Sequence, residues 1–239
     1  MSDAVPVPTD TDAVVAVDAG GPTLTWGRVV ALLVAVAFLG GAIGWAIGQR
    51  RVDPFSATDV GFMQDMGLHH EQAIQMSILL LDKEGIDDDL RSFAIEYLVG
   101  QRYEQGIFNG LLDRFGHSSD PGDTVMGWMG PPVPADQMEG LATDAQMADL
   151  RAATGTEAES LFIALMSEHH LGGLHMADEE ARKGHDKTVR NLALAMVKTQ
   201  RGEVIDLDRY RRNHDLPIPK GFTDPMDDQR LNPLSVTGD

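Results

Sequence analysis

The sequence predicts an all-α protein, a four-helix bundle made of two duplicated helical hairpins and preceded by one transmembrane helix. Three observations lead to this fold class. A single uncharged apolar run lies near the amino terminus, four long segments carry helical periodicity without the alternation of a strand, and one histidine-methionine motif occurs twice. An apolar content of 43% supplies enough side chains for a packed core.

The apolar run, Val29–Gly48, contains no charged residue and is about as long as a helix that crosses a bilayer. Trp26 and Trp45 lie near its two ends, where their rings favour the membrane interface. We therefore assign residues 24–49 to a transmembrane anchor helix. A cleaved signal peptide is the alternative, but the run is long and no small-x-small cleavage pattern follows it. Residues 1–23 lack usable periodicity and are predicted to be a disordered tail.

The bundle is predicted over residues 53–213. Gly85, Gly116 and Gly184 follow helical patterns and mark where helices end. The predicted segments are repeat one at 55–116, a Met/Gly/Pro-rich connection at 117–142, repeat two at 143–213, and a Pro-rich tail at 214–239. The four prolines of the tail prevent it from continuing the last helix.

The two repeats share a motif that is displaced by 100 residues. Met66–Met76 reads MGLHHEQAIQM and Met166–Met176 reads MSEHHLGGLHM, so both contain Met-x-x-His-His-x5-Met. The following helices match as well, because the Gln-Arg-x-Glu pattern of residues 101–104 returns at residues 200–203. One pair of helices has therefore been duplicated, together with its histidines and methionines.

The spacing of the motif places its histidines and methionines on one face of each helix. At about 3.6 residues per turn, these offsets fall within an arc of about 120°. Apolar residues such as Phe62 and Phe162 lie along the same arc, which predicts that it faces the core. Ala73 and Gly173 are small residues at equivalent positions and leave room for a helix or a ligand. The candidate metal-binding residues are Met66, His69, His70, Met76, Met166, His169, His170, His175 and Met176.

Imidazoles on a core face are costly unless they find partners. Imidazole and thioether ligands favour Cu(I) and similar soft ions, whereas Mg²⁺ and Ca²⁺ favour oxygen. The duplicated pattern therefore predicts a bound copper ion as cofactor. The alternative is a structural histidine network without metal, with hydrogen bonds to Gln101, Glu104, Gln200 and Glu203.

The connection contains a second, looser group of potential soft ligands. Its members are Met126, Met129, Met138 and Met147, together with His117. Such a group is predicted either to be an exchangeable copper-loading site or to be ordinary methionines of a flexible segment.

Composition excludes several other classes of protein. The net charge of −18 argues against nucleic-acid binding. The chain has no cysteine, which excludes disulfides, thiolate zinc sites and iron–sulfur clusters. The sequence also shows no Ser-His-Asp grouping, phosphate loop or dinucleotide fingerprint.

With its paired His-His motifs, flanking methionines, Gln-Arg-x-Glu segments and the MGWMG stretch of residues 126–130, the chain resembles the domain of unknown function 305 family over about residues 55–213. The resemblance implies a ferritin-like helical bundle and an exported or membrane-anchored protein, with copper or silver bound by some members in the periplasm. It also implies that the metal ligands are the His and Met residues of the two motifs. The family often has Ala where Gly173 stands, and His175 is an additional candidate in this chain.

The resemblance also bears on the orientation of the anchor. Arg28 precedes the apolar run and Arg50 and Arg51 follow it, so the flanking charges favour a cytoplasmic carboxyl side by one charge. The resemblance implies the opposite orientation, an extracytoplasmic bundle, and we adopt that as the expectation.

The resulting expectation is a single-pass membrane protein that sequesters or delivers Cu(I), with silver as a further ion, and has no enzymatic turnover. A ferritin-like di-metal oxidase is one alternative, although neither His pair has the Glu-x-x-His spacing of such sites. A non-metal interaction module of a membrane complex is the other. The protein partner and the oligomeric state are left open.

Overall fold

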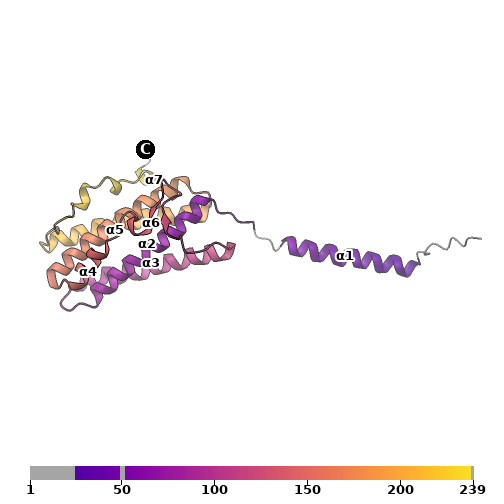
Figure 1. Ribbon diagram of the computed structural model, residues 1–239, viewed down its shortest axis with the longest axis horizontal. Helices are drawn as coiled ribbons and strands as arrows, with labels where there is room; N and C mark the ends of the chain where they lie inside the picture. The colour runs from indigo at the N-terminus through magenta and orange to yellow at the C-terminus, as the bar shows by residue number, and fades with distance from the viewer. Residues whose placement is uncertain (1–24, 49–51, 238–239) are drawn as a thin grey trace, which may run out of the picture. The chain divides into compact units, whose positions relative to one another are not determined.

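The computed structural model describes residues 25–48 and 52–237. The chain divides into two compact units, residues 1–51 and 52–239. The described part of the first unit is one helix, α1 (Trp26–Gly48), and the second unit contains the remaining elements (Figure 1). The tail predicted at residues 1–23 lies outside the described residues.

Helix α1 has 23 residues, with no acidic side chain in its first turn and no basic side chain in its last turn. Its segment Trp26–Trp45 has a mean hydropathy of 2.0, and no residue of the most apolar stretch of this segment is buried. Among the described residues, α1 is the one helix that is long and apolar enough to cross a membrane. Both a membrane anchor and a signal sequence have these properties, so the apolar helix is confirmed and the anchor stays a prediction.

Four long helices make up the second unit. Helices α2 (Ala57–Leu81) and α3 (Asp88–Phe115) form one hairpin, and α5 (Gly155–Lys183) and α6 (Lys187–Asn213) form the other. A shorter helix, α4 (Asp144–Ala152), precedes the second hairpin. The hairpins meet mainly along α2 and α5 (Figure 1). The predicted all-α bundle of two helical hairpins is thereby confirmed.

The helices begin and end where local chemistry favours it. Ser56 caps α2 through a capping box, in which its hydroxyl accepts from the Asp59 N–H and the Asp59 carboxylate accepts from the Ser56 N–H. Asp186 caps α6 by accepting two backbone N–H groups. Gly116 ends α3 with a left-handed φ of 80°, which a side chain would disfavour.

The connection and the tail contain more structure than the sequence predicts. In the connection, β1 (Thr124–Val125) pairs antiparallel with β2 (Val133–Pro134), and the short helix η1 (Ala135–Gln137) follows. The tail contains the helical turns η2 (Pro225–Asp227), η3 (Gln229–Leu231) and α7 (Leu234–Thr237). The prolines are compatible with these turns because Pro225 and Pro233 stand at or just before a helix start, where no N–H is required.

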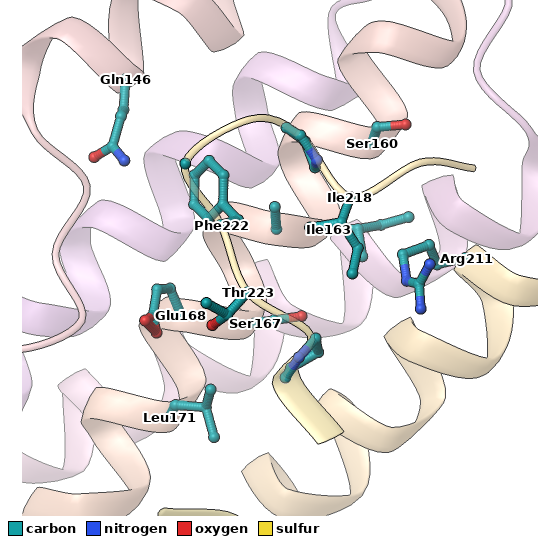
Figure 2. A pocket seen from close by; sticks show the side chains of 14 residues that line it. Gln146, Ser160, Ile163, Ser167, Glu168, Leu171, Arg211, Ile218, Phe222 and Thr223 are labelled. Carbon is teal, nitrogen blue, oxygen red and sulfur yellow. The ribbon is translucent and has the colours of Figure 1, made fainter. Parts of the chain in front are cut away.

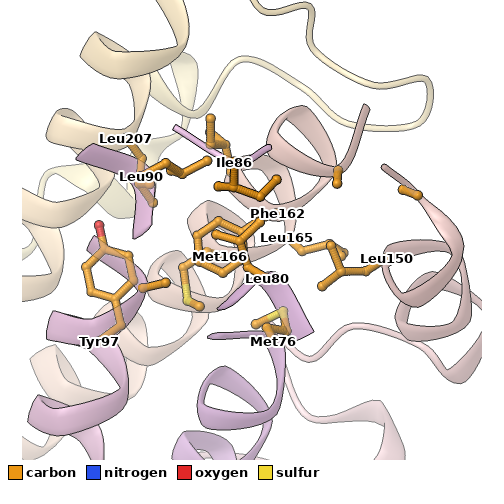
Figure 3. Close-up of a cluster of buried hydrophobic side chains, with 14 of the residues drawn as sticks. Met76, Leu80, Ile86, Leu90, Tyr97, Leu150, Phe162, Leu165, Met166 and Leu207 are labelled. Atoms are coloured by element: carbon orange, nitrogen blue, oxygen red, sulfur yellow. The ribbon is translucent and has the colours of Figure 1, made fainter. Parts of the chain in front are cut away.

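Two clusters of buried apolar side chains form the core. The Phe162 cluster is shown in Figure 3. Its buried members include Ala73, Met76, Leu80, Leu90, Tyr97, Leu150, Phe162, Leu165, Met166 and Leu207. The Phe62 cluster includes the buried residues Phe62, Met63, Met66, Phe108, Leu112, Val125, Met138, Met176, Val189, Met196 and Val197.

The two clusters show how α2 and α5 are oriented. Along α2, Met66 belongs to the Phe62 cluster and Met76 to the Phe162 cluster. Along α5 the order is reversed, with Met166 in the Phe162 cluster and Met176 in the Phe62 cluster. The helices therefore run antiparallel, and along each of them the His-His pair lies between the two clusters.

Candidate metal centre

Four fully buried histidines form the centre of the bundle, and we call them the histidine tetrad. His69 and His70 come from α2, His169 and His170 come from α5, and each has an exposed fraction of 0%. The rings of His69 and His169 lie against each other with centroids 3.7 Å apart. His169 Nε2 is 2.8 Å from the backbone carbonyl oxygen of His69 and donates to it. The predicted core face of both motifs is thereby confirmed.

The partner helices supply polar side chains to the tetrad. Glu104 of α3 accepts a hydrogen bond from His70, with Oε2 2.8 Å from Nε2. On the other side, His170 Nε2 lies 3.0 Å from the amide nitrogen of Gln101 and 3.5 Å from Glu203 Oε2. The predicted network of Gln and Glu around the histidines therefore exists in part.

The duplication is not exact at the second glutamine. Gln200 is the counterpart of Gln101, yet neither atom of its buried amide finds a hydrogen-bond partner among the described residues. Its Oε1 would lie 2.4 Å from a Cβ atom added to Gly173. The small residue at position 173 therefore makes room for the Gln200 side chain.

Burial keeps three of the four rings of the tetrad neutral. Loss of solvation lowers the pKa of His169 to about 3 and lowers the pKa values of His69 and His170 well below their ordinary range. Neighbouring histidines disfavour the charged forms of His69 and His170 further. Neutral imidazole is the form that binds metal ions.

Several ring nitrogens of the tetrad lack a partner. Within the described part of the chain, the Nδ1 atoms of His70, His169 and His170 have no hydrogen-bond partner. Neither ring nitrogen of His69 has a partner among the same residues. His169 donates from Nε2, so the Nδ1 atom of its neutral ring carries a free lone pair. A histidine fixed through one nitrogen while the other is free is the usual arrangement of a metal ligand.

The four motif methionines are buried on either side of the tetrad. Met66, Met76, Met166 and Met176 each have an exposed fraction of 0%. Because α2 and α5 are antiparallel, Met66 shares the Phe62 cluster with Met176, and Met76 shares the Phe162 cluster with Met166. The methionines therefore form two pairs at opposite ends of the tetrad.

The tetrad is not a preformed metal-coordination site. Within residues 25–48 and 52–237, no group of three or more His, Asp or Glu side chains is arranged to hold a metal ion. The donor types fit a soft cation, with neutral imidazoles and nearby thioethers. Binding would require the imidazole rings or thioethers to rotate toward a common ion.

His175 does not join the tetrad. It is half exposed, and its Nδ1 lies 2.7 Å from Glu139 Oε2. The hydrogen bond to Glu139 raises the pKa of His175. Residue 175 precedes Met176 by one position and is therefore turned about 100° away from it around the helix. Its assignment as a ligand stays a prediction.

The connection methionines divide between the two clusters. Met138 is buried in the Phe62 cluster and Met126 and Met129 pack against it, whereas Met147 lies in the Phe162 cluster. His117 lies apart and pairs with Asp53, with 2.6 Å between Nε2 and Oδ2. The looser group predicted from the sequence is therefore not one cluster.

The Phe62 cluster is instead rich in methionine. It combines connection residues with methionines of three long helices, namely Met63, Met66, Met126, Met129, Met138, Met176 and Met196. Met196 was not among the residues expected at the site. Its position four residues before Gln200, on the same face of α6, is the sequence signal that places it there.

The chain is similar to a family of proteins and to several solved structures. The family model for the domain of unknown function DUF305 matches residues 59–211. A solved DUF305 protein from Streptomyces coelicolor is 32% identical, with a TM-score of 0.63 and coverage of 68% of this chain and 96% of that chain. A DUF305 fragment from Deinococcus radiodurans is 27% identical, with a TM-score of 0.58 and coverage of 67% and 99%, respectively.

A more distant likeness is to CopM in its Cu(I)-bound form. The identity is 23%, the TM-score is 0.50, and the match covers 66% of this chain and 99% of CopM. At that identity, the likeness shows a shared fold. No match is found among curated proteins.

Proposed function

The chain belongs to the DUF305 family, and from this premise we propose that its bundle binds Cu(I), with Ag(I) as a further ion, to sequester or deliver it without enzymatic turnover. The observation that carries the proposal is the histidine tetrad with its flanking methionine pairs. Four fully buried imidazoles recur at duplicated positions, and most of their ring nitrogens have no partner among the described residues.

Physical chemistry supports an ion at this place. A buried polar group without a partner typically costs about 1–3 kcal/mol, so several unpartnered nitrogens in one core are a substantial penalty. A soft cation that accepts their lone pairs would offset that penalty. The thioethers of Met66, Met76, Met166 and Met176 provide further soft donors without any charge to desolvate.

Copper is favoured over the alternatives by the donor set. Mg²⁺ and Ca²⁺ require oxygen ligands, and the carboxylates nearest the tetrad lie against imidazole nitrogens, as Glu104 does against His70. A di-metal oxidase requires bridging carboxylates between two ions. CopM has been solved in Cu(I)-bound and Cu(II)-bound forms, which is a property of that protein and a precedent for this fold.

We further propose that α1 anchors the bundle to a membrane in a single pass, with the bundle on the extracytoplasmic side. The length and hydropathy of α1 support this, and the Streptomyces coelicolor relative is described as a secreted protein. A donor set of His and Met without Cys suits an oxidising compartment, because thioethers do not form disulfides.

The deciding experiment is a titration with Cu(I) itself. Full-length protein in phospholipid nanodiscs is titrated under ascorbate against the chromogenic chelator bicinchoninate, with empty nanodiscs as the blank. Wild-type protein is expected to withdraw Cu(I) from the chelator at a defined stoichiometry. His69→Ala/His169→Ala should abolish this withdrawal, and Met66→Leu/Met166→Leu should weaken it tenfold or more while conserving core volume.

His117→Ala/His214→Ala is the matched control because both residues lie outside the tetrad, His117 against Asp53 and His214 against Tyr210. Circular dichroism verifies that each variant keeps its helices. Unchanged stoichiometry and affinity in the folded His69/His169 variant would refute the proposal. Iron-dependent oxygen consumption by the wild type would instead indicate the oxidase.

A further inference from the structure

The histidine tetrad is closed on three sides by packed structure. The Phe62 and Phe162 clusters cover its two ends with buried apolar side chains. The connection covers a third side, where a Cβ atom added to Gly172 of α5 would lie 2.7 Å from the Cα of Gly140. An ion that entered along any of these sides would have to separate close-packed side chains or backbone, which is costly.

A cavity of about 320 Å³ lies between α5 and tail residues 218–225 (Figure 2). Ser160 and Ile163 of α5 are among its lining residues, and none of the four histidines is. Ser160 and His169 are nine residues apart, which is half a turn around the helix. The cavity therefore lies on the opposite face of α5 and does not lead to the tetrad.

The fourth side of the tetrad lies between α3 and α6. These two helices approach each other less closely than α2 and α5 do. Glu104 of α3 has a side chain that is 25% exposed, and its Oε2 lies 2.8 Å from His70 Nε2. Glu203 of α6 has a side chain that is 17% exposed, and its Oε2 lies 3.5 Å from His170 Nε2. The two glutamates therefore connect buried histidines with solvent.

Two further carboxyls lie near this pair. Burial, together with the negative charges of Glu104, Glu96 and Asp206, raises the pKa of Glu203 to about 8. We call these four residues the acidic seam. Asp206 also pairs with Arg209, which balances part of its charge. The carboxyls of the acidic seam are close enough to repel one another, so a cation between them would relieve the repulsion.

A buried amide lies beside the acidic seam. Gln101 is 4% exposed, and its amide nitrogen lies 3.0 Å from His170 Nε2. Its amide oxygen has no hydrogen-bond partner in the part of the chain that the structure describes. Gln101 precedes Glu104 by three positions and therefore shares its face of α3. An ion that passes the two glutamates has this free oxygen available next to His170.

We propose that Glu104 and Glu203 form the entry site for Cu(I), from which the ion passes to His70 and His170. This inference rests on the proposed function, because it assigns the path to the same metal site. Carboxylate oxygens are weak ligands for a soft ion, whereas imidazole nitrogens and thioethers are strong ones. A negative site at the surface attracts the cation without retaining it, and the stronger ligands below then take it up.

The test measures how fast Cu(I) enters the bundle. Full-length protein in nanodiscs is mixed without oxygen with substoichiometric Cu(I) in buffer that contains acetonitrile, and excess bicinchoninate is added after increasing delays. Copper that has reached the tetrad resists rapid chelation, so the dependence on delay gives the uptake rate. Glu104→Gln/Glu203→Gln should slow uptake by about tenfold or more. Release should slow by the same factor, which leaves the equilibrium affinity nearly unchanged.

Two further variants separate the entry site from other effects. Glu96→Gln/Asp206→Asn changes the outer carboxyls of the acidic seam and should slow uptake by about threefold or more, without altering the two glutamates that lie against histidines. Glu84→Gln/Glu157→Gln removes the same amount of charge from exposed positions, in the turn before α3 and in the first turn of α5. This matched control should keep the wild-type rate.

Unchanged uptake and release in the folded Glu104/Glu203 variant would overturn the entry site and leave the copper site intact. A loss of affinity at an unchanged uptake rate would also overturn it, because the glutamates would then position the imidazoles or bind the ion permanently. Equal slowing of the matched control would show that net charge alone sets the rate. Absence of equilibrium Cu(I) binding by the wild type would refute the proposed function, and the entry site with it.

Discussion

Two adjacent glycines of α5 provide a direct test of how the connection and α6 pack against that helix. A Cβ atom at Gly172 would lie 2.4 Å from the backbone oxygen of Glu139 and 2.7 Å from the Cα of Gly140. A Cβ atom at Gly173 would also meet an atom at 2.4 Å, but that atom is the side-chain Oε1 of Gln200. The two clashes are equally close and differ in what must move.

The expected free energies of unfolding differ accordingly. Replacing a helical glycine by alanine gains about 1 kcal/mol of helix propensity at either position. At Gly172 the backbone of the connection must shift, which places the overpacking cost in the upper part of its usual range, at about 2–3 kcal/mol. After the gain in helix propensity is subtracted, Gly172→Ala should be destabilising by about 1–2 kcal/mol. At Gly173 the flexible Gln200 amide can rotate away, and Gly173→Ala should be neutral or stabilising by up to about 1 kcal/mol.

Urea unfolding of the full-length chain in nanodiscs, followed by circular dichroism, measures the difference. The two variants should be separated by about 2 kcal/mol, or by roughly 4–8 °C in Tm for a unit of this size. Equal stabilities would show that the connection does not press against α5 as described. The Cu(I) titration of Gly173→Ala additionally reports whether the position of Gln200 affects the tetrad.

Three further predictions concern buried carboxyls and topology. Burial and the nearby negative charge of Asp59 raise the pKa of Glu180 from 4.5 to about 9, so the folded chain keeps a proton that the unfolded chain has released. The contribution of this group to the free energy of unfolding therefore falls by about 1.4 kcal/mol per pH unit between roughly pH 5 and 9. Glu180→Gln should remove this pH dependence from the free energy measured by urea unfolding, and an unchanged slope would contradict the assignment. Asp65 Oδ2 accepts hydrogen bonds from the Met126 N–H at 2.6 Å and from the Trp128 indole N–H at 2.8 Å. Asp65→Ala should therefore lower the free energy of unfolding by about 1–3 kcal/mol, and Asp65→Asn should lower it less. Equal losses in the two variants would argue against these hydrogen bonds. Because the chain has no cysteine, Ser119→Cys should react with a membrane-impermeant maleimide in intact cells if the bundle is extracytoplasmic, and labelling only after lysis would reverse the topology.

The fold was predictable because the information is local and occurs twice. Gly116 and Gly184 mark helix ends as predicted, whereas α2 ends at Leu81, four residues before Gly85. The repeated motif shows that the two hairpins are equivalent. The burial of His69, His170 and their neighbours also followed from helical spacing alone. These predictions depend only on residues within one or two turns of each other.

The arrangement of the site depended on information that lies far apart in the chain. Nothing in the motif states whether Met66 meets Met166 or Met176, because that is decided by how the two hairpins dock. The position of Met126 also depends on a residue far away in the chain, because the buried Asp65 carboxylate accepts a hydrogen bond from the Met126 N–H. His175 shows the limit of spacing arguments, since one position along the helix turned it toward Glu139.

The antiparallel meeting of α2 and α5 has a consequence for how the chain folds and how it arose. Each hairpin is held by contacts close in sequence, whereas the tetrad joins residues about 100 positions apart. Local contacts form fast and distant ones carry the cost of loop closure, so the tetrad is expected to assemble in the last step of folding. Two equivalent hairpins that meet in an antiparallel arrangement have the symmetry of a two-fold homodimer. A single ancestral hairpin that paired with its own copy would already have contained all four histidines. Fusion of the two genes would then have allowed each half to diverge, as the different surroundings of Gln101 and Gln200 illustrate.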